Sequence, residues 1–241
     1  MVGVSCNRYE DRLLQLFEDL EASRGQGMGT PGGKTRSKSI RELKRLECPI
    51  NYDIKGGKSS FKMISKIISW NVRGLNEPGT RLGVRNLLRK WRADLVCLQE
   101  TKVEDVSRDI VSSLWGGQHV GYQFLGSSGA SGGILIVWDT RVFDMEEVSE
   151  GLFSLSISFR NIEDSFRWMF VGVYGPNVDE HRSGLWAELA GMMAWWNLPT
   201  CIGGDFNVIR FPTERSSRGR LTRAMEDFSD FIRENDWWIC L

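Results

Sequence analysis

Two polar side chains end an apolar segment late in the sequence. The stretch TCIGGDFNVI, residues 200–209, passes through two glycines to Asp205 and Asn207, which flank Phe206. In an extended chain, residues two positions apart share a face, so this carboxylate and this carboxamide would point the same way. A turn is the simpler explanation, because Gly, Asp and Asn all favour turns. An active site at the end of a strand is the other.

Further segments that read as strands also end on polar side chains. Asn71 ends KIISWN, Glu100 follows LVCLQ, and Tyr174 and Asn177 follow MFVGV. Each residue alone has a simpler interpretation as a turn, cap or solvated residue. Polar residues at strand ends far apart in sequence are, however, how a scaffold assembles one site from its loops. Their joint occurrence therefore favours a site.

The side-chain types indicate which chemistry such a site would perform. Glu100 and Asp205 offer hard oxygen ligands, and Mg²⁺ usually takes only one or two carboxylates from a protein. Asn71, Asn177 and Asn207 are neutral groups that can hold phosphate oxygens or a metal-bound water. This combination suits phosphodiester hydrolysis with Mg²⁺ or Mn²⁺, where positioning and charge stabilisation dominate.

Regular alternation of strands and helices begins at Lys66 and would position these residues. Val84, Leu87, Leu88 and Trp91 recur at helical spacing within TRLGVRNLLRKW. We expect strands at 66–72, 94–100, 132–138, 152–159, 167–175 and 200–207, and helices at 80–91, 107–115, 184–196 and 221–235.

The strand pattern indicates how these elements pack. LFSLSISF alternates apolar residues with serines, which predicts a strand with one wet face, and RWMFVGVYG should pair with it as a hairpin. These features favour an α+β fold of two sheets packed face to face with helices outside. A parallel α/β fold is the rival, since strand, helix and strand alternate early.

Residues 1–62 differ from the domain expected over residues 63–241. They carry 12 basic and 8 acidic side chains, a net of +4, against 19 basic and 23 acidic in the remainder, a net of −4. The region is rich in Gly, Ser and charge, which predicts a largely disordered segment with a short helix near residues 9–23. KTRSKSIRELKR could serve as a nuclear-targeting signal, although such charge runs are usually just solvated.

Composition restricts the class of protein further. Basic and acidic residues number 31 each, so global charge does not argue for nucleic acid. The five cysteines form no CxxC pair, which predicts an intracellular protein without disulfides or structural zinc. No secretion signal or membrane-spanning stretch is visible, and no obligate oligomer is expected.

The segments SWNVRGLN, LVCLQETK, GGILIVWD, VYGPN and GGDFNVI, in this order, resemble the endonuclease/exonuclease/phosphatase superfamily. Within it they are most similar to the apurinic-endonuclease-like domain of plant LINE-type retrotransposons, over residues 64–233. The resemblance implies a DNase I-like fold of two mixed sheets flanked by helices. It also implies DNA as substrate and an origin beside a reverse transcriptase in a polyprotein.

Residue by residue, the resemblance implies the following roles. Asn71 would help position the metal or phosphate, and Glu100 would bind the metal. Asp205 would orient or deprotonate the attacking water, and Asn207 would stabilise the transition state. The remaining candidates would contact the substrate phosphate or nucleic-acid backbone: Tyr174, Asn177, Arg73 and Lys102. Solvation is an equally good interpretation of the last two.

The sequence departs from the family pattern in one respect. It ends at RENDWWICL and contains no Ser-Asp-His motif, and neither His119 nor His181 occupies a matching position. A missing general acid–base group typically costs about 10²- to 10⁴-fold in rate. We therefore expect a truncated domain with an incomplete second sheet and weak or no activity. A non-catalytic remnant and a phosphatase of the same fold are the alternatives.

Overall fold

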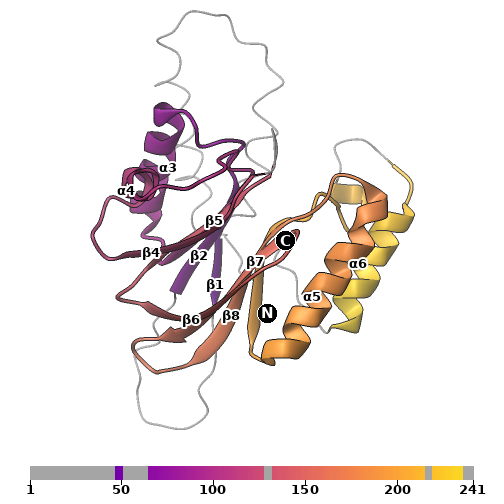
Figure 1. Ribbon diagram of the computed structural model, residues 1–241. Helices are drawn as coiled ribbons and strands as arrows, with labels where there is room; N and C mark the ends of the chain where they lie inside the picture. The colour runs from indigo at the N-terminus through magenta and orange to yellow at the C-terminus, as the bar shows by residue number, and fades with distance from the viewer. Residues whose placement is uncertain (1–46, 51–64, 128–131, 215–218, 236–241) are drawn as a thin grey trace, which may run out of the picture.

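The computed structural model describes residues 47–50, 65–127, 132–214 and 219–235 of the 241-residue chain. They form two mixed sheets that pack face to face, with α3 and α4 on one side of the molecule and α5 and α6 on the other (Figure 1). The expected α+β class is confirmed. The rival of a single parallel sheet is wrong, because five of the seven strand pairs are antiparallel.

The first sheet has the strand order β1-β2-β3-β5-β4. Its strands are β1 (Glu47–Ile50), β2 (Ser65–Asn71), β3 (Leu95–Gln99), β4 (Val120–Leu125) and β5 (Ile134–Asp139). Within it, β2 and β3 run parallel, so both end at the same edge of the sheet. β3 and β5 are buried along their whole length, which explains their continuous apolar sequences.

The second sheet has the strand order β6-β7-β8-β9. Its strands are β6 (Phe143–Glu150), β7 (Ser154–Asn161), β8 (Arg167–Tyr174) and β9 (Thr200–Asp205). β7 and β8 form the expected antiparallel hairpin, and β9 adds to β8 in parallel. β9 is half-buried throughout, because within the described residues it is paired on one side only.

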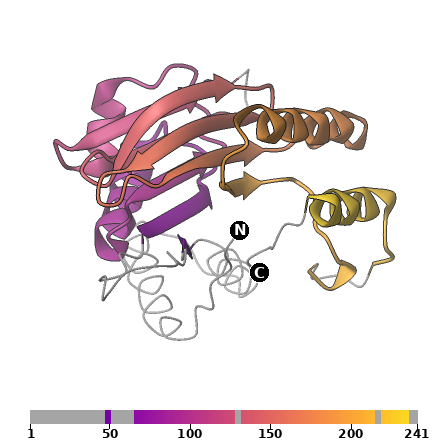
Figure 2. The same cartoon turned by 90° about the horizontal axis from the view of Figure 1, so that it is seen from below.

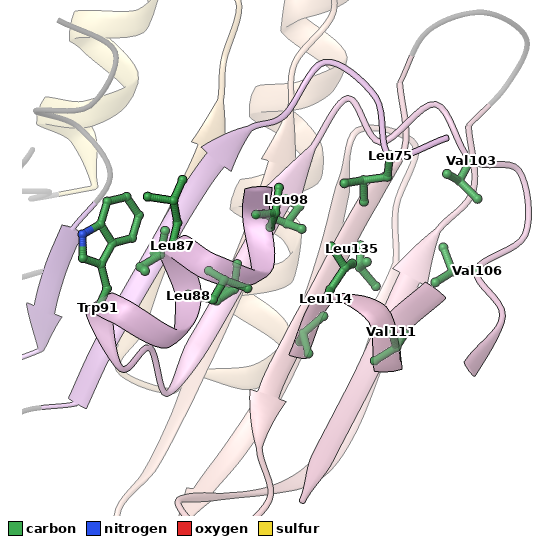
Figure 3. Packing of buried hydrophobic residues seen from close by; sticks show 14 residues of the cluster. Leu75, Leu87, Leu88, Trp91, Leu98, Val103, Val106, Val111, Leu114 and Leu135 are labelled. Atoms are coloured by element: carbon green, nitrogen blue, oxygen red, sulfur yellow. The ribbon is translucent and has the colours of Figure 1, made fainter. Parts of the chain in front are cut away.

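Helices α3 (Pro78–Trp91) and α4 (Arg108–Trp115) cover the outer face of the first sheet. The predicted apolar face of α3 is buried, and it packs with α4 residues such as Leu114 against Leu98 and Leu135 of the sheet (Figure 3). Pro78 starts α3, and Arg92 ends it in the left-handed conformation. This layer fixes the first sheet from outside.

Helices α5 (Arg182–Trp196) and α6 (Arg223–Glu234) belong to the layer outside the second sheet, with α6 beside α5 (Figure 2). The short 3₁₀ turns η1 (Asp179–His181) and η2 (Pro212–Glu214) lie in the loops that precede α5 and α6. Leu185 and Leu189 of α5 pack on the outward-facing side chains of β8, and Phe231 of α6 joins them.

The prediction of a wet serine face on β7 is wrong. Ser154, Ser156 and Ser158 are at most 1% exposed, because α5 covers this face of the sheet. Glu188 of α5 accepts hydrogen bonds from the Ser154 hydroxyl and from two backbone N–H groups before it. The serines are therefore buried between the sheet and α5. The alternating sequence pattern alone does not distinguish such buried serines from solvated ones.

The sheets approach each other closely near β9. A Cβ atom on Gly203 would lie 3.2 Å from the Cβ of Ser69 in β2 and 3.1 Å from the ring of Phe170. Glycine here removes a side chain from the interface and lets β9 pack against β2. The first glycine of GGDFN therefore sets the distance between the sheets beside Asp205.

The region of residues 1–62 contributes β1 to the first sheet, antiparallel to β2. The helix expected near residues 9–23 and the terminal WWICL lie outside the described residues. No helix in the described part is long and apolar enough to span a membrane.

Candidate active site

The predicted site residues follow four strands that end at one edge of the molecule. In the parallel pair β2 and β3, Asn71 lies opposite Gln99, so Glu100 is the next residue on β3. In the parallel pair β8 and β9, Tyr174 lies opposite Asp205. Parallel strands end at the same edge, and β9 packs across from β2 and β3. The fold therefore brings both pairs of strand ends together.

Asp205 is the centre of the hydrogen-bond network that joins the two sheets. The Asn71 side-chain amide donates to Asp205 Oδ2 over 2.8 Å. The backbone N–H of Asn207 donates to Asp205 Oδ1 over 2.9 Å, and the Asn207 side-chain amide donates to the carbonyl of Gly175 over 2.6 Å. Both carboxylate oxygens thus have fixed donors, which holds the carboxylate in one orientation.

Tyr174 places a hydroxyl in the same network. Its side chain forms hydrogen bonds with the side chains of Asn177 and Asn207. Burial raises the pKa of Tyr174, and the negative charges of Glu100 and Asp205 raise it further. The phenol therefore stays protonated at neutral pH and can donate a hydrogen bond to an oxyanion.

The two basic candidates lie beside the acceptors. Lys102 Nζ forms an ion pair with Glu100 Oε1 over 3.2 Å. The backbone N–H of Arg73 donates to Asn71 Oδ1 over 3.2 Å, while its side chain is exposed. With these contacts, the structure brings together all eight residues singled out in the sequence: Asn71, Arg73, Glu100, Lys102, Tyr174, Asn177, Asp205 and Asn207.

Backbone strain is concentrated at this cluster. Of the seven non-glycine residues with positive φ in the described part of the chain, four belong to it: Arg73 at 57°, Glu100 at 54°, Lys102 at 56° and Asn207 at 52°. For residues with a side chain, the left-handed conformation costs roughly 1–2 kcal/mol. Such strain persists only where the surrounding contacts impose it, and it is typical of functional sites.

The donor set fits a hard divalent cation. Glu100 and Asp205 provide two carboxylates. The Lys102 ammonium, itself a cation, lies beside the Glu100 carboxylate. No group of three or more His, Cys, Asp or Glu side chains suited to a metal occurs in the described part of the chain. Mg²⁺ commonly binds through one or two carboxylates and keeps several waters, so two carboxylates are sufficient.

Neither histidine belongs to the cluster. His119 is exposed before β4, and His181 is exposed in η1. This placement agrees with the sequence analysis, in which neither histidine occupies a position that matches the family motif.

Two features of the site were not visible in the sequence. Arg182, 8% exposed, donates from Nη2 to the carbonyl of Asn207 over 2.8 Å. Gly132 and Gly133 accept hydrogen bonds at their carbonyls from Lys102 and Thr101, which brings the loop before β5 against the site. One property of the sequence pointed to Arg182. It stands at the start of an expected helix, where the helix dipole disfavours a cation.

Comparison with known proteins gives the family. A family model described as "Endonuclease/Exonuclease/phosphatase family" matches residues 68–238. The exodeoxyribonuclease of Bacillus subtilis is 30% identical over 187 residues, covering 70% of this chain and 68% of that protein. The DNA-(apurinic or apyrimidinic site) endonuclease 2 of Xenopus laevis is 46% identical over 46 residues, which are 19% of this chain and 8% of that protein.

The fold has solved counterparts as well. The AP endonuclease LMAP from Leishmania major superimposes with a TM-score of 0.56 at 17% identity, covering 77% of this chain and 71% of that one. This superposition supports the fold of two mixed sheets flanked by helices described above. The chain belongs to the endonuclease/exonuclease/phosphatase family.

Proposed function

We propose that this chain is a divalent-metal-dependent phosphodiesterase domain that cleaves DNA internally. The observation that carries the proposal is the network in which Asp205 is held by Asn71 and Asn207, with Tyr174 and Glu100 beside it. The named activities of the matched relatives, an exodeoxyribonuclease and an endonuclease for abasic DNA, support a nucleic-acid substrate.

Each residue has a role that its contacts allow. Asp205, fixed by two amide donors, orients a water molecule and accepts its proton. Tyr174, kept protonated, donates to a phosphate oxygen, together with Asn177. Asn207 donates from its side-chain amide to the Gly175 carbonyl and bonds the Tyr174 hydroxyl, and we assign it to the stabilisation of the oxyanion that develops in the transition state. Arg73 and Lys102 contact the neighbouring backbone phosphates.

Glu100 would bind Mg²⁺ or Mn²⁺, and Asn71, whose amide also fixes Asp205, would help to position the metal. When bound, the cation supplies charge stabilisation at the phosphate and lowers the pKa of a coordinated water. Lys102 would move from Glu100 to a substrate phosphate, since its ammonium and the cation compete for the same carboxylate.

The activity we propose is slow. The described residues place no histidine at the site, and a positioned general acid–base group contributes about 10²- to 10⁴-fold in rate. A chain with no detectable cleavage would be the non-catalytic remnant considered above. We further propose a LINE-type retrotransposon origin and a nuclear location, on the motifs SWNVRGLN, LQETK and GGDFN and the basic KTRSKSIRELKR. A reverse transcriptase continuing in the same reading frame would test that origin.

Nicking of supercoiled plasmid by the purified chain tests the function. We expect open-circular product with Mg²⁺, none with EDTA, and none from the double variant Glu100→Ala, Asp205→Ala. The matched control is Glu104→Ala, Asp105→Ala, which removes two exposed acids close to Glu100 in sequence and should nick like the wild type. Equal nicking by both double variants would contradict the proposal. Hydrolysis of p-nitrophenyl phosphate without nicking would instead identify the phosphatase alternative.

A further inference from the structure

We infer that Arg182 is a positioning residue, whose buried guanidinium holds the turn from Asp205 to Asn207 in its active geometry. The inference rests on the proposed function for its catalytic consequence. Arg182 is the first residue of α5 and touches the turn through one hydrogen bond, from Nη2 to the Asn207 carbonyl over 2.8 Å. It reaches none of the reacting groups directly, so it acts through the backbone.

The turn needs such a contact because its backbone is strained. Asn207 has a φ of 52°, and its N–H is directed back to Asp205 Oδ1. Its side chain is directed to the Gly175 carbonyl. Asparagine tolerates this conformation better than most residues, but a change to negative φ would rotate the amide away from Gly175 and release one oxygen of Asp205. The carbonyl of Asn207 is the remaining polar group of this residue's backbone, and Arg182 fixes it.

The position of Arg182 is unfavourable for stabilising α5 itself. A cation at the first residue of a helix opposes the helix dipole, and α5 has no acidic residue in its first turn to compensate. The side chain is 10% exposed, whereas its ion-pair partner Asp179 is 69% exposed, so the pair adds little stability. The Nε atom of Arg182 is buried without a hydrogen-bond partner among the described residues. The guanidinium therefore has two contacts, the largely exposed ion pair to Asp179 and the bond to Asn207, and the second is the one that reaches the turn.

Phe206 completes the support from the other side of the turn. Its ring stacks on Trp186 of α5 with centroids 6.2 Å apart and packs on Phe228 of α6 at 5.1 Å. The residue between Asp205 and Asn207 is therefore anchored in an aromatic cluster, while Arg182 anchors Asn207. Both anchors come from α5, so the helix and the turn keep one relative position.

The test compares Arg182→Met, which removes the charge at similar length, with Arg182→Lys, which keeps the charge but cannot reach Asp179 and Asn207 together. The matched control is Arg233→Met, which breaks an ion pair of the same i,i+3 spacing on the exposed face of α6. The readouts are the rate of plasmid nicking, its KM, the melting temperature and the side-chain amide resonances of Asn207.

We expect Arg182→Met to lower kcat about 10²-fold, the loss typical of a misplaced catalytic group, with KM little changed. Arg182→Lys should recover part of that loss, and Arg233→Met should match the wild type. The Asn207 amide resonances should move toward the positions of a free carboxamide in Arg182→Met and less far in Arg182→Lys.

Unchanged Asn207 resonances and an unchanged rate in a folded Arg182→Met protein would overturn the inference. If that variant does not fold, Arg182→Lys decides on the same two readouts. A wild-type chain that never nicks DNA would refute the proposed function, yet the amide resonances would still show whether Arg182 holds the turn.

Discussion

The Tyr174 hydroxyl bonds two carboxamides, and burial, together with two carboxylates close by, raises its pKa and keeps it protonated. Replacing Tyr174 with Phe removes one preorganised donor but leaves the ring packed near Gly132. We expect nicking to fall about 10²-fold, as when one oxyanion donor is removed, with the fold intact. The measurement is the single-turnover nicking rate. Tyr122→Phe, in β4 outside the site, is the control, and equal rates for the two variants would exclude a role for the hydroxyl.

Asp139 and Arg141 give a test of pH dependence away from the site. The side-chain hydrogen bond from Arg141 is the main reason that the pKa of Asp139 is lowered. A carboxyl with a lowered folded-state pKa contributes stability above its unfolded pKa of about 3.9 and loses it as the pH falls through the folded value. Arg141→Met should therefore be less stable than the wild type at pH 7.

The stability difference should begin to close as the pH drops below about 3.9, the unfolded-state pKa, and should be lost as the pH falls through the lower folded-state pKa of Asp139. Urea unfolding at a series of pH values measures it. In the double variant Arg141→Met, Asp139→Asn the difference from Asp139→Asn alone should be small at every pH. A gap between wild type and Arg141→Met that stays constant to pH 2 would show that the ion pair is not its source.

At the scale of elements, the packing of β9 on β2 depends on Gly203. A Cβ there would press on Ser69 and Phe170 at 3.1–3.2 Å, closer than side chains usually pack. Gly203→Val should lower the free energy of unfolding by about 1–3 kcal/mol, the usual cost of overpacking. Gly191→Ala is the counterpart, because Gly191 lies within α5 with nothing inside 4 Å of a new Cβ.

Gly191→Ala should raise the free energy of unfolding by about 0.5–1 kcal/mol, since alanine favours the helix. Urea unfolding measures both changes. If β9 packs on β2 as closely as described, the free energy of unfolding should fall in Gly203→Val and rise in Gly191→Ala. A Gly203→Val protein as stable as the wild type would mean that the two sheets can separate there without cost.

The elements that the sequence indicated well are those with a strong period or a continuous apolar run. The helix containing Val84 and Trp91, and the buried strands β3 and β5, fall in this group. β6 was not expected, because on this edge strand most side chains are exposed and several are charged. β4 was missed as well, since Gly121 and Gln123 interrupt its pattern. The burial of Ser156 follows from α5 lying above it, which no local pattern contains.

The candidate site also contains residues that the sequence indicated and one that it did not. Asn71, Glu100, Tyr174 and Asp205 could be found because they stand directly at strand ends, where a change from apolar to polar residues is visible. For Arg182 an unusual cation at a helix start was the one signal, and its role could not be found from it, because the contact joins the helix start to a turn 25 residues later. Which polar residues meet across two sheets depends on strand order, and strand order is a property of the assembled fold.

At the scale of the whole molecule, the aromatic cluster of Trp186, Phe206, Phe228 and Phe231 connects α6 to the site. Phe228→Ala should cost about 3–5 kcal/mol of stability, as for other buried aromatic residues. Nicking should also slow at temperatures where the variant is still folded, because Phe206 loses a neighbour. Thermal melting and nicking at low temperature measure the two effects. Phe211→Ala, at an exposed ring, is the control for stability.

The left-handed conformations at Arg73, Lys102 and Asn207 have a consequence for engineering this chain. Glycine would relieve the strain at each position, so a selection for heat resistance alone would favour replacing these residues. Each replacement would also make more flexible the loop that positions Asn71, Glu100 or Asp205. A thermostable variant selected without an activity screen should therefore lose its cleavage chemistry first, while its sheets and helices stay unchanged.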